Sequence, residues 1–173
     1  MSEYQYYEFV AVDRPLTPDE QRELRAVSTR GRITASSFVN DYQWGDLKAD
    51  PHRWMKEYFD AHLYLANWGS RRVALRLPAR LLPPEVAATY CCVGDTATSW
   101  ATGEHVILDL HTEDENGDEW WEEDGVLASI IPVRADLAAG DHRLLYLGGC
   151  CACRTRNWTR TSRSHLSRAG WGS

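Results

Sequence analysis

The feature that most limits what this chain can fold into is a change in chemistry at Gly148. Residues 1–148 hold all 25 acidic residues and 14 of the 19 Lys and Arg residues, which gives them a net charge of −11. Residues 149–173 hold five Arg, three of the five Cys and no acidic residue. We therefore expect one globular domain over residues 1–148 and a separate basic tail over residues 149–173.

The basic tail allows three interpretations. Its composition, rich in Arg, Ser and Thr, is typical of a disordered segment. Arg residues interleaved with Trp158 and His165 would also suit a nucleic-acid-binding arm, because Arg contacts phosphates and aromatic rings stack on bases. Finally, the tail can be written back into its possible codons and read in a shifted frame that starts at the third base of the Gly148 codon. In that frame the codons permit a sequence that contains Leu and Asp and suits a helix. On that hypothesis the tail is frameshifted and non-native.

Local patterns within residues 1–148 predict a mixture of strands and helices. Apolar alternation between turn residues predicts five strands, with a sixth short one, at residues 4–12, 37–44, 62–67, 72–77, 103–111 and 119–121. Helix-capping residues and apolar stripes predict helices at residues 17–28, 51–59, 85–90 and 125–148, the last interrupted by Pro132 and Gly140. The expected fold class is α+β, with three to five helices packed on a mixed or antiparallel sheet of about five strands.

Two of the expected strands differ in how their faces are covered. Residues 4–12 are apolar or aromatic on both faces, which predicts a strand covered on two sides. In residues 72–77 the apolar side chains alternate with Arg72, Ala74 and Arg76, which predicts a strand with one solvated face.

The sequence also indicates where in the cell the protein resides and which classes of partner it can bind. The opening MSEYQYYEF lacks the features of a signal peptide, and no apolar run approaches the roughly 20 residues of a membrane span. The Cys spacing does not suggest a disulfide framework. We therefore expect a cytoplasmic protein with no membrane partner. Because the charge of −11 repels phosphate, we expect nucleic acid as a partner only if the basic tail is genuine.

Two surfaces are candidates for binding another protein. Trp120 and Trp121 stand among eight acidic residues between positions 113 and 124, a pattern that suits recognition of a basic partner. Trp68 stands close to Arg71, Arg72 and Arg76, where Arg beside an aromatic ring could grip a carboxylate or a phosphate. The alternatives are a solvated hairpin tip and a strand edge protected by charge.

No pattern in the sequence predicts a reaction, a cofactor or a metal. Common nucleotide-binding, hydrolase and metalloprotease motifs are absent. His105 and His111 share a strand face but lie about 20 Å apart on it, so they do not bind one ion. Cys91 and Cys92 have no paired His at a recognised spacing and are more typical of buried thiols.

The opening YQYYEFVAVDRPLT, together with SFVN at 37–40, WGD at 44–46, YFD at 58–60 and LYLANWG at 63–69, resembles a family of uncharacterised bacterial proteins. The resemblance covers residues 4–148 and implies no activity, so no functional residue is carried over.

The resulting expectation is a non-enzymatic interaction protein that binds another protein through an acidic, aromatic surface. The alternatives are an enzyme or nucleotide-binding module with an unfamiliar site near Asp13, Arg14, Trp44 and Asp46, and nucleic-acid binding through the basic tail.

Overall fold

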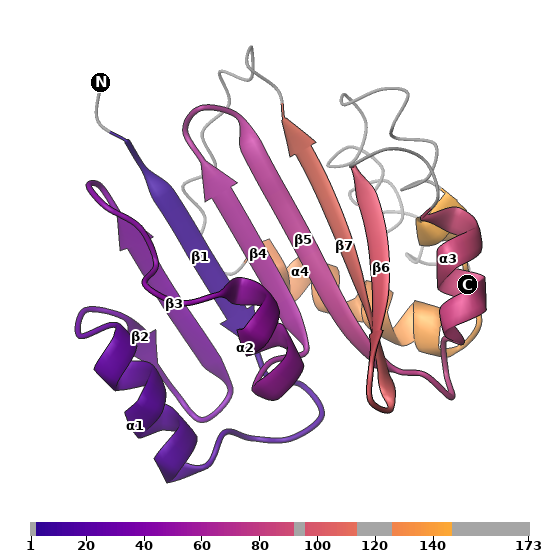
Figure 1. Cartoon of the computed structure of the whole chain (residues 1–173), viewed down its shortest axis with the longest axis horizontal. Helices are drawn as coiled ribbons and strands as arrows, with labels where there is room; N and C mark the ends of the chain where they lie inside the picture. The colour runs from indigo at the N-terminus through magenta and orange to yellow at the C-terminus, as the bar shows by residue number, and fades with distance from the viewer. Residues whose placement is uncertain (1–2, 92–95, 114–125, 147–173) are drawn as a thin grey trace, which may run out of the picture.

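The computed structural model describes residues 3–91, 96–113 and 126–146 (Figure 1). Within these residues one antiparallel sheet has the strand order β2-β3-β1-β4-β5-β7-β6. Its strands are β1 (Gln5–Val10), β2 (Arg32–Ile33), β3 (Ser37–Tyr42), β4 (Ala61–Ala66), β5 (Ser70–Pro78), β6 (Ala97–Thr102) and β7 (His105–Glu113). The helices are α1 (Pro18–Val27), α2 (Pro51–Glu57), α3 (Pro84–Tyr90) and α4 (Val126–Ala138), and residues 143–146 form a further helical turn.

The α+β class is confirmed, but the described sheet has seven strands rather than about five. The two strands that the sequence did not predict are β2 and β6. β2 has only two residues, which is too short to show a period, and β6 reads ATSWAT, in which small and polar residues hide the alternation. The predicted short strand at residues 119–121, Gly148 and the basic tail lie outside the described residues.

The predicted helix starts are confirmed, because their signals are local. The Thr17 hydroxyl accepts a hydrogen bond from the backbone N–H of Glu20, and the Glu20 carboxylate accepts one from the N–H of Thr17. Asp50 likewise caps α2 by accepting from the N–H of His52. The expected interruption at Pro132 is wrong, since α4 continues through that residue to Ala138.

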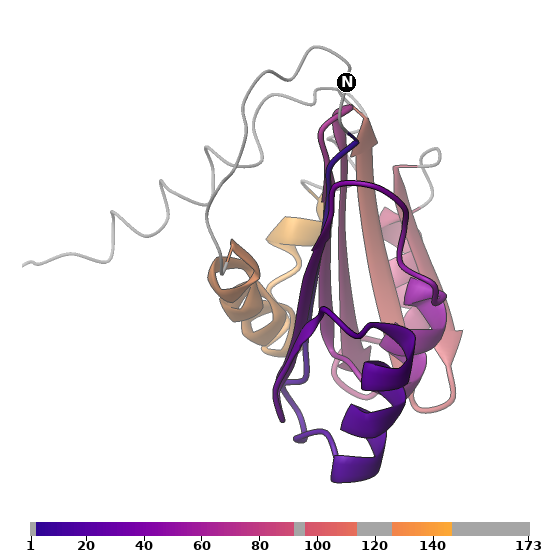
Figure 2. The same cartoon turned by 90° about the vertical axis from the view of Figure 1, so that its left-hand side faces the viewer.

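The helices cover both faces of the sheet. Figure 2 shows α4 on one side and α1 and α2 on the other. β1 is buried on both faces of the sheet, as predicted. Tyr6 belongs to the apolar cluster on the α4 side, and Tyr7 and Phe9 belong to the cluster on the side of α1 and α2. No helix in the described part of the chain combines the length and the apolarity that crossing a membrane requires.

The prediction of a solvated face on residues 72–77 is wrong. α2 packs against that face of β5. Arg76 is only 6% exposed there, and Ala74 belongs to the buried cluster beneath α1 and α2. Alternation with Arg looks like a solvated face in the sequence because the buried partner of Arg76 lies elsewhere in the chain.

Candidate functional site

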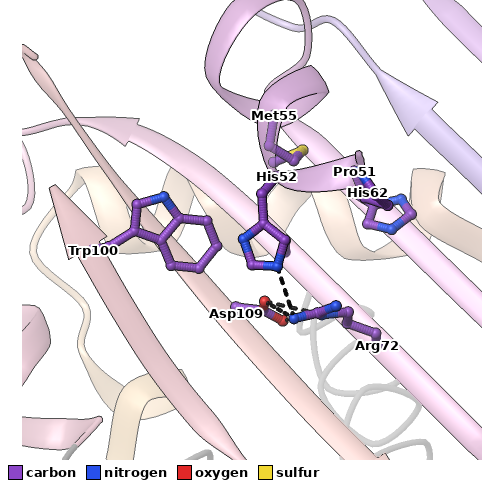
Figure 3. Close-up of a pocket in the computed structure, with 8 residues that line it drawn as sticks. Pro51, His52, Met55, His62, Arg72, Trp100 and Asp109 are labelled. Carbon is purple, nitrogen blue, oxygen red and sulfur yellow. Dashed lines mark hydrogen bonds and ion pairs between the residues drawn. The ribbon is translucent and has the colours of Figure 1, made fainter. Parts of the chain in front are cut away.

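A small hollow lies between α2 and the middle of the sheet (Figure 3). The space open to the centre of a water-sized sphere measures about 10 Å³, which is room for about one water molecule. The residues that line it come from α2, β4, β5, β6 and β7: Pro51, His52, Met55, His62, Arg72, Ala74, Trp100 and Asp109.

The pairing of strands brings these residues together. His62 on β4 stands directly opposite Ala74 on β5, and Ala74 stands opposite Asp109 on β7. Side chains at directly opposed positions share a face of the sheet, so all three face α2. The capped first turn of α2 then places His52 above them, with its ring 4.7 Å from that of Trp100.

Arg72 and Asp109 form the charged part of the hollow. Asp109 is buried and accepts hydrogen bonds from Arg72 Nε at 2.8 and 2.9 Å, and Arg72 Nη2 lies 2.6 Å from the same carboxylate. Arg72 Nη2 also lies 3.1 Å from His52 Nε2. Because a guanidinium can only donate, this His52 nitrogen is the acceptor and its hydrogen is on Nδ1.

His62 forms the neutral part of the hollow. Its side chain is 2% exposed, and its ring stacks on Phe9 with the centroids 3.9 Å apart. Nδ1 lies 3.0 Å from the carbonyl oxygen of Glu8, so Nδ1 carries the hydrogen and donates it. Burial lowers the pKa of His62 to about 3, with Arg72 adding to the effect, so the ring is uncharged at neutral pH.

The other nitrogen of His62, Nε2, has no exposed surface in the hollow. It is buried and finds no hydrogen-bonding partner within the described ranges. No local sequence pattern indicates this, since His62 reads only as a polar residue in an apolar strand. In the part of the chain that the structure describes, no three His, Cys, Asp or Glu side chains are grouped closely enough to hold a metal ion.

The structure separates the residues predicted to bind as one group around Trp68. Arg72 lines the hollow, whereas Arg76 pairs with Asp60 through Nε at 3.0 Å and Nη2 at 2.7 Å. Arg71 alternates onto the opposite face, the one covered by α4. Trp68 is 46% exposed at the turn between β4 and β5. Trp120 and Trp121 lie outside the described residues.

The four residues of the alternative site are also separated. Trp44 and Asp46 follow β3 beside the start of β1, whereas Asp13 and Arg14 follow the end of β1. A six-residue strand is about 20 Å long, so these pairs do not form one site. Arg134 holds the Asp13 carboxylate, and Glu20 holds Arg14.

Trp44 and Trp68 instead lie at the same end of the sheet. Trp44 is 73% exposed two residues beyond Tyr42, and Trp68 stands two residues beyond Ala66. Tyr42 and Ala66 pair with Gln5 from opposite sides, so the two Trp residues flank the start of β1. We call this surface the aromatic end, and it also includes three exposed acidic residues, Glu3, Asp41 and Asp46.

Comparisons with known proteins identify no relative: no family model, no curated protein and no solved structure matches this chain. The resemblance to uncharacterised bacterial proteins therefore stays a prediction.

Proposed function

We propose that this protein is a non-enzymatic, cytoplasmic interaction protein that binds a basic segment of another protein at the aromatic end. The observation that carries the proposal is the exposure of Trp44 and Trp68 on the two sides of β1. Exposed Trp is uncommon on a surface without a partner and is enriched among the residues that dominate binding energy at interfaces.

The spacing of the two Trp residues suits a single segment of a partner. β3 and β4 are the two neighbours of β1, so their backbones lie about 10 Å apart. Two indoles that extend from loops at this separation could be covered together by a few residues of one chain. This fold buries Trp where it uses Trp for packing, as it does with Trp54 of α2.

Hydrogen bonds hold both loops of the aromatic end in place. Gln5 donates to the carbonyl of Gly45 at 2.9 Å, and the Tyr7 hydroxyl donates to Asp46 at 2.6 Å. Burial, followed by the hydrogen bond to Asp46, raises the pKa of Tyr7 and keeps this donor protonated. The amide of Tyr4 donates to the Asn67 side chain beside Trp68. Preorganised loops lose little conformational entropy on binding.

Charge indicates the chemistry of the partner. The exposed carboxylates of Glu3, Asp41 and Asp46 accompany the two indoles, and the whole chain has a net charge of −6. Lys and Arg side chains pair with carboxylates and also bind the faces of Trp rings through cation–π contacts. A basic partner segment therefore satisfies both features of the surface.

The alternative functions receive less support from the described residues. The hollow beside His62 has room for about one water molecule, which is far less than a nucleotide or a metabolite requires. The basic tail, on which nucleic-acid binding depends, lies outside the described residues. Both alternatives stay predictions.

The test compares affinity-purified partners of the tagged wild-type protein with those of Trp44→Ala and Trp68→Ala. Leu81→Ala is the matched control, because Leu81 is exposed at the opposite end of the sheet. We expect at least one basic partner that the control retains and that both Trp variants bind about 30-fold more weakly, as loss of an interface hot spot predicts. Equal recovery by all four proteins would refute the proposal.

A further inference from the structure

We propose that the basic tail, residues 149–173, occupies the aromatic end of its own chain, so that a basic partner must displace it. This inference rests on the proposed function, because it adds a competitor at the same surface. The chemistry of the tail is the same whether its sequence is native or frameshifted.

The described chain ends close to the end of the sheet that carries Trp44 and Trp68. Tyr146 donates its backbone N–H to His142, whose ring lies 6.1 Å from that of Tyr90, the last residue of α3. In Figure 1, residues 143–146 lie beside the end of α3, near the start of β6. The antiparallel pairing puts the start of β6 at the end of the sheet where β1 begins and β4 finishes.

The tail is long enough to reach both indoles from there. From β6, β4 is three strands away and β3 is five, which correspond to about 14 and 24 Å at the usual strand spacing. Arg154 and Arg168 follow Tyr146 by eight and 22 positions, so an extended chain would allow them separations of up to about 26 and 73 Å. No strand or helix of the domain has to move for this contact.

Opposite charges favour the contact at this surface. Besides the three acidic residues of the aromatic end, Glu113 exposes its carboxylate at the same end of the sheet, where β7 finishes. Of the two adjacent Arg residues on β5, Arg72 is neutralised by Asp109, and Arg71 lies on the α4 face. The tail supplies five Arg and no acid, and Arg binds both carboxylates and the faces of Trp rings.

The covalent connection strengthens a contact that would be weak between separate molecules. A segment joined to its site within one chain has an effective concentration on the order of 1 mM. An intrinsic Kd of roughly 0.1 mM would then leave the tail bound in about nine molecules of ten and weaken partner binding about tenfold.

The experiment is NMR of the full-length protein with ¹⁵N-labelled Trp, in which Trp44→Phe and Trp68→Phe assign the two indole signals. The wild-type chain is compared with a variant in which all five Arg of the tail are replaced: Arg154→Gln, Arg156→Gln, Arg160→Gln, Arg163→Gln and Arg168→Gln. We expect the two indole signals to differ between these proteins at about 50 mM salt and to converge at about 500 mM, because salt screens exposed charges.

Two controls keep the result specific. The indole signal of Trp54, which is buried, should be the same in both proteins. A matched variant with Lys at the five tail positions keeps the charge and should keep the wild-type signals of Trp44 and Trp68.

Identical Trp44 and Trp68 signals in the wild-type and Gln proteins at low salt would overturn the inference. Differences that depend on protein concentration would also overturn it, since the tail would then bind a second copy. Neither measurement involves a partner, so the tail contact is judged separately from the proposed function, which the recovery of partners tests. A basic partner recovered in that test should bind the Gln variant about tenfold more tightly than the wild-type chain, and equal affinity would refute displacement alone.

Discussion

Replacing Asp60 with Asn should destabilise the protein strongly, because Asp60 connects three parts of the fold. The carboxylate is fully buried at the start of β4. One oxygen accepts from Arg76 Nε and Nη2 at 3.0 and 2.7 Å, and the other accepts from the backbone N–H groups of Val12 and Asp13 at 2.7 and 2.9 Å. Arg134 of α4 approaches the same carboxylate at 3.9 Å.

The size of the effect follows from what Asn would leave behind. Arg76 would stay buried without a counter-charge, and the amide NH₂ would face either the guanidinium or two backbone donors. Removing one partner of a buried ion pair costs about 3–5 kcal/mol. For a domain of this size, that corresponds to a fall in Tm of roughly 6–20 °C.

Urea unfolding, monitored by Trp fluorescence, measures how much the variant lowers the free energy of unfolding relative to the wild-type protein. Asp19→Asn is the matched control, since its partner Arg22 is exposed and an exposed pair contributes at most about 1 kcal/mol. The double variant Asp60→Asn/Arg76→Met should be less destabilised than the sum of the two single variants, because it leaves no uncompensated charge. A loss below about 1 kcal/mol for Asp60→Asn would refute this account of the ion pair.

Three further predictions concern stability. The folded-state pKa of His62, about 3, lies below its ordinary value of 6.5, so the unfolded chain binds more protons between these values. Stability should therefore fall as the pH falls through this window, and His62→Phe should flatten that part of the profile in urea titrations. Thr17→Ala removes the capping box of α1 and should cost about 1 kcal/mol in the same assay. Leu127→Ala leaves a cavity at a fully buried position of α4 and should cost about 2–5 kcal/mol, read as a lower Tm by calorimetry.

The parts of the fold that the sequence predicted are those determined by neighbouring residues. The Thr17 cap and the Asp50 cap each act within three residues. The burial of β1 on both faces could be predicted because both sets of alternating side chains in this strand are largely apolar or aromatic. β6 was missed because its pairing with β7, rather than any apolar pattern of its own, makes it a strand.

The candidate site could not be predicted because its contacts are distant in the chain. Arg72 was expected to bind a partner, but its carboxylate, Asp109, lies 37 positions away. His62 receives its orientation from Glu8, 54 positions away. No local pattern shows that one nitrogen of a buried histidine is satisfied while the other is not.

The strand order has a consequence for how the protein is made. Each of β3, β4, β5 and β7 pairs with a strand that precedes it in the chain, so the sheet can grow as the polypeptide leaves the ribosome. α4 is synthesised after every strand described here, and until it emerges α3 is the only described helix that packs against the apolar side chains on that side of the sheet. A nascent chain that ends at Glu113 would contain every strand of the described sheet, with the apolar side chains of one face only partly covered. Chaperone demand should therefore peak just before α4 is completed.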